Sequence, residues 1–137
     1  MASFFYTRSV ASLLQGNIAL ATATMKATLV DSADYVANKD THDFYDDITA
    51  AGRVATGTLV NVTVVAGVAT VTIDANDLTL SSVSGDQSEA VVIWEDTAGA
   101  ESADPVVLYL ELVAPITPNG GDIVLQWHVN GLATVST

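Results

Sequence analysis

Residues 60–73 read VNVTVVAGVATVTI. On both sides of Ala66-Gly67, apolar and mostly β-branched residues alternate with Asn or Thr, a period of two that is typical of half-buried β-strands. The same alternation returns at 106–112 and at 123–129. We therefore predict an all-β fold, a two-sheet antiparallel β-sandwich with jelly-roll or immunoglobulin-like connections. With 137 residues the chain is expected to form one domain, 1–137, with its own core.

The sequence around this stretch predicts further elements. Residues 25–30 read as the first core strand, and 90–94 are apolar throughout, as in a central strand covered on both faces. Ala66-Gly67 is expected to form a tight hairpin in which the glycine supplies a positive φ, and turns are expected around Gly52 and Gly57.

Two short helices are expected in the first third of the chain. The first, 9–15, would be capped by Ser9 and ended by Gly16, with Val10, Leu13 and Leu14 on one face. The second, 41–48, would be capped by Asp40 or Thr41, with Phe44 and Ile48 on one face.

Composition narrows the class of protein. Four Lys and Arg against 16 Asp and Glu give a net charge of −12, which opposes binding to nucleic acid or to anionic membranes. The absence of cysteine excludes disulfides and thiolate metal sites. No apolar run approaches a bilayer span and no cleaved signal is expected, so the chain should be soluble. Half of the residues are hydrophobic, which predicts apolar surface that lies against a partner.

The residues that carry chemistry are few. His42 and His128 are the only histidines, and neither belongs to a nucleophile or phosphate-binding motif. We therefore expect no enzyme activity, no catalytic residue and no cofactor. Trp94 and Trp127 could form a sugar-stacking platform, but both lie in apolar strand patterns and are expected in the core.

One acidic cluster stands out, formed by Asp40, Asp43, Asp46 and Asp47 around His42. It could bind Ca²⁺ through carboxylate oxygens, or it could simply complement a helix dipole and face water. The spacing lacks the features of a calcium loop, so no metal site is assigned. A pair of carboxylates for glycoside cleavage could also occur among so many acids.

The N-terminal segment 1–8 is a candidate arm. Phe4, Phe5 and Tyr6 are consecutive aromatic residues, which could dock on a neighbouring subunit or cover the domain's own open end. We take these three residues as the candidate interface.

Several short motifs follow one another along the chain. They are LLQGNIAL at 13–20, MKATLV at 25–30, Tyr35 with DFYDDI at 43–48, LTL at 78–80, AVVIWEDT at 90–97 and GDIVLQW at 121–127. Their order resembles a family of small structural proteins from tailed bacteriophages. The chain departs from the family pattern in the loop 97–104 and in the segment 115–118. The resemblance implies a virion component made in the host cytoplasm.

Among virion roles, the small acidic β-sandwich suits a capsid decoration (cement) protein. Such a protein would bind the major capsid protein on the outer shell, associate with itself as a homotrimer, and clamp neighbouring capsid subunits. The alternative within the virion is a tail or fibre-associated protein, including a host-recognition module. A polysaccharide hydrolase or a carbohydrate-binding module are the alternatives from other classes.

Overall fold

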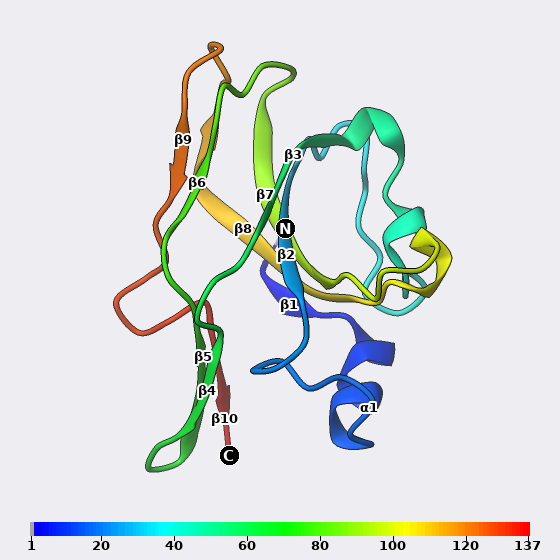
Figure 1. Ribbon diagram of the computed structural model, residues 1–137, viewed down its shortest axis with the longest axis vertical. Helices are drawn as coiled ribbons and strands as arrows, with labels where there is room; N and C mark the ends of the chain where they lie inside the picture. The colour runs from blue at the N-terminus through cyan, green and yellow to red at the C-terminus, as the bar shows by residue number, and fades with distance from the viewer. Residues whose placement is uncertain (1) are drawn as a thin grey trace.

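The computed structural model describes residues 2–137. Its centre is a five-stranded sheet in the order β1-β8-β7-β2-β3, in which all neighbours are antiparallel (Figure 1). The strands of this central sheet are β1 (Phe4–Phe5), β2 (Met25–Val30), β3 (Arg53–Thr58), β7 (Ser88–Glu95) and β8 (Val106–Ile116).

Two smaller antiparallel sheets form a second layer, on the left in Figure 1. One has the order β10-β5-β4, from β4 (Thr63–Ala66), β5 (Thr70–Asp74) and β10 (Ala133–Ser136), and the other pairs β6 (Leu78–Leu80) with β9 (Ile123–Leu125). The predicted all-β, sandwich-like fold is confirmed, with its second layer split into these two sheets.

The opposite face of the central sheet is covered by the segment 31–52 rather than by a sheet (Figure 1). This segment contains the 3₁₀ helices η1 (Tyr45–Asp47) and η2 (Ala50–Gly52), and η3 (Glu101–Ala103) packs against η1. The one α-helix within residues 2–137, α1 (Thr7–Leu14), follows β1 at the lower end of the molecule in this view.

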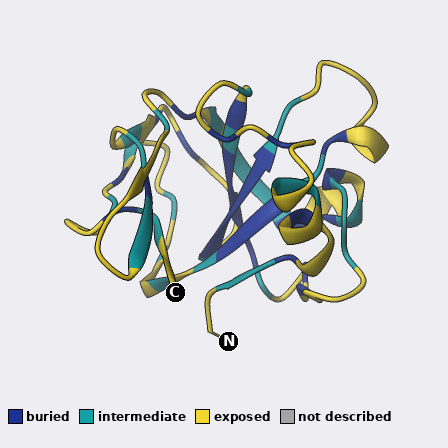
Figure 2. Cartoon of the chain, turned by 90° about the horizontal axis from the view of Figure 1, so that it is seen from below, coloured by how far each residue is buried: buried dark blue, intermediate teal, exposed yellow. Residues whose placement is uncertain are grey.

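Strand β7 shows why the central sheet is buried on both sides. Val91 and Ile93 belong to the apolar cluster under the small sheets, whereas Val92 and Trp94 belong to the cluster under segment 31–52. All four side chains are at most 5% exposed. The prediction of a strand covered on both faces is confirmed, and Figure 2 shows these buried strands at the centre of the molecule.

The first helix lies close to its predicted position, but its start differs. α1 begins at Thr7 with Tyr6 at the N-cap, and Ser9, the predicted cap, is a buried residue inside the helix. The Ser9 hydroxyl donates a hydrogen bond to the carbonyl of Val106 in β8. Gly16 follows the helix with φ +78°, as expected for a glycine that ends it.

The buried hydroxyl of Ser9 gives a first testable prediction. Replacing Ser9 by Ala should lower the free energy of unfolding by about 1–2 kcal/mol, because the Val106 carbonyl loses a buried donor. Ser12→Ala, in the same helix at a less buried position, is the matched control and should change stability by less than about 0.5 kcal/mol. Equal effects in chemical denaturation would contradict this role for Ser9.

The prediction of a second helix, 41–48, is wrong. Only three residues, Tyr45–Asp47, are helical, and they form one 3₁₀ turn after an isolated β-bridge between Phe44 and Pro105. The Asp47 carboxylate accepts hydrogen bonds from the backbone N–H groups of Asp43 and Phe44, which holds the turn in place of a cap at Asp40 or Thr41.

Four turn and strand details also differ from prediction. In the hairpin between β4 and β5 the positive φ falls on Ala69, at 62°, and not on Gly67. Gly57 lies within β3, where a Cβ would come 2.8 Å from the Leu80 side chain of β6. The strand predicted from residue 60 begins at Thr63, and β9 ends at Leu125, well before residue 129.

Among the described residues, no helix has the length and apolar character needed to cross a membrane.

Candidate functional site

His42 belongs to a chain of hydrogen-bonded rings under segment 31–52. The Tyr6 and Tyr35 hydroxyls lie 2.9 Å apart, and the Tyr35 hydroxyl lies 3.0 Å from Nδ1 of His42. The same Nδ1 accepts a hydrogen bond from the backbone N–H of Asn38, and the imidazole stacks on the Tyr35 ring. Burial raises the pKa of Tyr35 to about 12 and raises the pKa of Tyr6 further. Both hydroxyls are therefore protonated at neutral pH, and the network holds the fold together rather than activating a nucleophile.

These raised pKa values predict loss of stability in alkali. In the unfolded chain tyrosines ionise near their ordinary pKa of 10.0, whereas Tyr6 and Tyr35 ionise later in the folded protein. Their contribution is complete below pH 10 and is lost as the pH rises toward 12. We expect the free energy of unfolding to fall across this window in urea titrations. A free energy that stays constant there would contradict the prediction.

His128 is an exposed residue on the segment after β9. Its Nδ1 accepts a hydrogen bond from the backbone N–H of Asn130, and its backbone forms a β-bridge with Gly131. The imidazole is thus part of a local turn, as expected for a surface histidine.

The acidic cluster predicted from the sequence does not converge on one point. Asp40 accepts hydrogen bonds from Lys39 and Thr7, Asp43 forms an ion pair with Arg8, and Asp47 holds the η1 turn. Within residues 2–137, the one group of acids with oxygens within 4.8 Å of one another is a different set, Asp31, Asp34 and Asp86.

Two carboxylates do line a small hollow of about 270 Å³ beside Tyr35 and Tyr109. These are Glu89 and Glu111, on the neighbouring strands β7 and β8. The Glu89 carboxylate accepts hydrogen bonds from both the backbone N–H and the hydroxyl of Ser32, so it anchors the start of segment 31–52. A glycosidase acid must instead carry a proton that it can deliver to a leaving group. This arrangement therefore favours a structural role for Glu89.

The two tryptophans have different surroundings. Trp94 is buried, stacks on Tyr45 with ring centroids 3.9 Å apart, and donates a hydrogen bond to Thr28, as expected for a core residue. Trp127 lies beyond the end of β9 and is only half-buried, with its indole N–H bonded to the carbonyl of Asn76. The prediction that Trp127 is a core residue is wrong, because β9 ends two residues before it.

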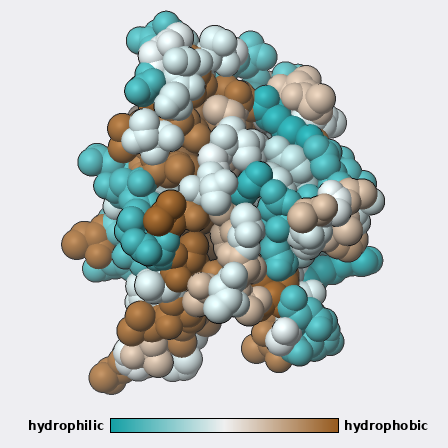
Figure 3. All heavy atoms as spheres, in the orientation of Figure 1, coloured by the Kyte–Doolittle hydropathy of each residue, from teal (hydrophilic) through white to brown (hydrophobic). Residues whose placement is uncertain are grey.

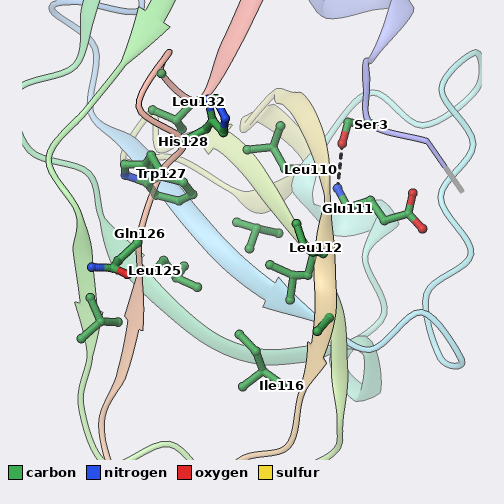
Figure 4. Close-up of a pocket in the computed structure, with 15 residues that line it drawn as sticks. Ser3, Leu110, Glu111, Leu112, Ile116, Leu125, Gln126, Trp127, His128 and Leu132 are labelled. Atoms are coloured by element: carbon green, nitrogen blue, oxygen red, sulfur yellow. Dashed lines mark hydrogen bonds between the residues drawn. The ribbon is translucent and has the colours of Figure 1, made fainter.

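Trp127 lines a hollow of about 420 Å³ between β8 and the segment 123–132, which we call the β8–β9 hollow (Figure 4). Its floor is apolar, from Leu110, Leu112, Ile116, Leu125 and Leu132. The polar residues Gln126 and His128 also line it, and the Glu111 side chain points away from it (Figure 4). Val113, Val124 and Val129 are all more than half exposed on the elements around this hollow. These features fit a surface that binds another molecule.

A second and larger hollow of about 640 Å³ lies at the lower end of the molecule, between α1 and the β10-β5-β4 sheet. We call it the apolar groove. One wall carries Val64, Val71, Ile73 and Val135 from the sheet, and the other carries Val10, Leu13 and Leu14 from α1. Figure 3 shows this end as a fork with hydrophobic atoms on its arms. No residue that lines the groove is charged.

The candidate interface residues Phe4, Phe5 and Tyr6 pack largely on the chain itself. Phe4 stacks on Tyr109 in β8, Tyr6 is completely buried, and Phe5 is half-buried and lines the apolar groove. A role for them in contacts with a neighbouring subunit stays a prediction, which Phe5 is best placed to serve.

No protein-family model matches this chain, and a search of curated proteins finds no match either.

Proposed function

We propose that this protein is a structural component of a tailed-bacteriophage virion, a decoration (cement) protein that binds the major capsid protein on the outer shell. The proposal combines the resemblance of the sequence motifs with the surface of the fold. Its expected partners are the major capsid protein and further copies of the chain, arranged as a homotrimer.

The observation that carries the proposal is the β8–β9 hollow with its exposed valines. A monomeric soluble protein rarely exposes a contiguous apolar patch unless the patch binds something. Val113 and Val129 are 108% and 90% exposed, so water surrounds apolar side chains that a partner could cover. The apolar floor of the hollow could receive a loop or side chain of a capsid subunit.

The charge distribution supports an outer position on the shell. Acids gather in segment 31–52 and in the stretch 95–104, away from the β8–β9 hollow. An acidic surface turned toward solvent keeps the particle soluble and does not attract nucleic acid.

The first test is the copy number of the chain per particle, measured by quantitative mass spectrometry of purified virions against the major capsid protein. A ratio close to stoichiometric is expected for a decoration protein. A handful of copies would move the protein to the tail, and absence from the particle would overturn the virion role.

A variant identifies the surface that binds the shell. Val113→Asp should reduce the copies per particle by about tenfold or more, because a charge would be buried against the capsid. Val36→Asp is the matched control, since Val36 is 70% exposed on the opposite side of the central sheet, in segment 31–52. Equal occupancy of both variants would exclude the β8–β9 hollow as the binding surface.

A tail or fibre-associated role in host recognition is the second candidate, and the position of Trp127 favours it. A partly exposed indole beside Gln126 and His128 could stack on a sugar ring while the polar side chains bond its hydroxyls. Binding to host glycans that is lost in Trp127→Ala would support this role, and no binding across a glycan array would remove it.

A further inference from the structure

Charged side chains are unevenly distributed over this acidic chain. The stretches 9–25, 54–73 and 123–137 contain no Asp, Glu, Lys or Arg, although the whole chain carries 20 such residues. These stretches supply all but one of the residues that line the apolar groove, from α1, the loop after it, β4, β5 and β10. The lower end of the molecule therefore presents an apolar groove without charged walls.

The β10-β5-β4 sheet is only partly covered by the chain itself. All four residues of β4 are exposed, and three of the four in β10 are exposed. The strand pairs put Val64 beside Ile73, and Val71 beside Val135, on the face that lines the groove. Water in the groove lies against apolar walls. Covering these walls with an apolar partner would release that water and stabilise the sheet.

β4 is also an unprotected sheet edge. Natural proteins protect such edges with charged residues, proline, bulges or covering elements. The strand Thr63–Ala66 contains no charged residue and no proline, and its register with β5 has no bulge. The hairpin tip that follows is uncharged and narrow, with Val68 98% exposed.

We propose that the apolar groove binds the β4–β5 hairpin tip, residues 66–69, of a second copy of this chain. The groove and the tip lie at the same end of the molecule, where the hairpin and α1 form the two arms of the fork in Figure 3 and the groove lies between them, so forked ends of neighbouring copies can interlock. Such a contact between two different patches can be reciprocal between two copies, can close a ring, or can continue as an open filament.

The uncharged walls argue against a basic partner and suit an apolar one. A groove built for a basic partner would carry acidic residues, and no residue that lines this groove is acidic. Two copies that each carry a charge of −12 repel one another, and this repulsion is smallest when they meet through the end without charged stretches. The hairpin tip of this chain is apolar and uncharged, which is what the groove walls require.

This contact would supply the association between copies that the proposed function expects. It is tested on the purified chain alone, so its failure is distinguishable from failure of the virion role. Sedimentation equilibrium over a range of concentrations should give a mass above that of one copy. Val68→Lys changes the hairpin tip, and Leu14→Lys changes the α1 wall of the groove. Each variant should raise the protein concentration at which half of the oligomer dissociates by about tenfold or more. Val36→Lys, at an exposed position in segment 31–52, is the matched control and should leave it unchanged.

Cysteine cross-linking tests the geometry of the contact, since the chain contains no cysteine of its own. An isotope-labelled Val68→Cys variant is mixed with unlabelled Leu14→Cys under mild oxidation. A disulfide between the two variants is expected, because the tip and the α1 wall of the groove come together, whereas Val36→Cys with Leu14→Cys should give none. A chain that stays monomeric, or an oligomer that is insensitive to both lysine variants, would overturn the proposal. In the monomeric case the groove would serve another protein.

Discussion

Replacing Trp94 by Ala should lower the free energy of unfolding by about 3–5 kcal/mol, the usual cost of removing a large buried aromatic side chain. The Trp94 ring fills the cluster between the central sheet and segment 31–52, where it stacks on Tyr45 at 3.9 Å. Its indole N–H also donates to Thr28, whose hydroxyl lies 2.8 Å from that of Thr56 in β3. The loss would be a large share of the 5–15 kcal/mol that stabilises a typical domain. Chemical denaturation followed by circular dichroism measures it.

Two variants separate the causes of this effect. Trp94→Phe keeps an aromatic ring but removes the bond to Thr28, and it should cost about 1–2 kcal/mol. Trp127→Ala removes the other tryptophan, which is half-buried, and should cost less than Trp94→Ala. If Trp127→Ala were the more destabilising change, the assignment of Trp94 as the core residue would be wrong.

Replacing Gly131 by Ala should destabilise the protein by about 3 kcal/mol or more, through strained backbone and overpacking together. Gly131 has φ +97°, and a Cβ there would lie 2.5 Å from the carbonyl oxygen of Ile73 in β5. Because that oxygen belongs to the backbone, the segment before β10 would have to move away from β5. Thermal unfolding of the variant measures the loss.

Gly120→Ala is the matched control for this glycine. Gly120 also has a positive φ, +87°, but a Cβ there would meet no atom within 4 Å. This variant therefore reports the backbone strain alone, about 1 kcal/mol. Equal losses in the two variants would show that the contact with Ile73 has no energetic effect.

The strand pattern in the sequence predicted the central part of the fold well. Residues 25–30 form β2 with the predicted bounds, and the apolar run 90–94 lies inside β7, between two cores. These predictions succeeded because the spacing of apolar residues along a strand depends directly on whether one or both of its faces are buried.

Segment 41–48 was mispredicted because its apolar spacing has another cause. Ile48 is buried against the central sheet, and Phe44 reaches Pro105 through a β-bridge, so an i, i+4 spacing arose without a helix. The Asp47 carboxylate then satisfies backbone N–H groups that a helix would have used otherwise. Such tertiary contacts override local propensity and cannot be read from spacing.

The candidate sites were only partly visible in the sequence. The aromatic residues at 4–6 stood out in the sequence, yet Tyr6 is a core residue. Its burial was missed because β1 is so short that its pairing with β8 could not be foreseen. The apolar groove was missed because its walls come from α1, β4, β5 and β10, which are far apart in the chain. The long stretches without charged residues were the available signal for it.

The position of the central sheet between two cores has a consequence for amide hydrogen exchange. Amides of β7, which is buried on both faces, should exchange only when the whole chain unfolds. Amides of β4, which is exposed along its length, should exchange through local opening of the β10-β5-β4 sheet. An interlocked neighbour would slow exchange in the second group alone. Exchange rates compared at low and high protein concentration would then map the contact between copies residue by residue.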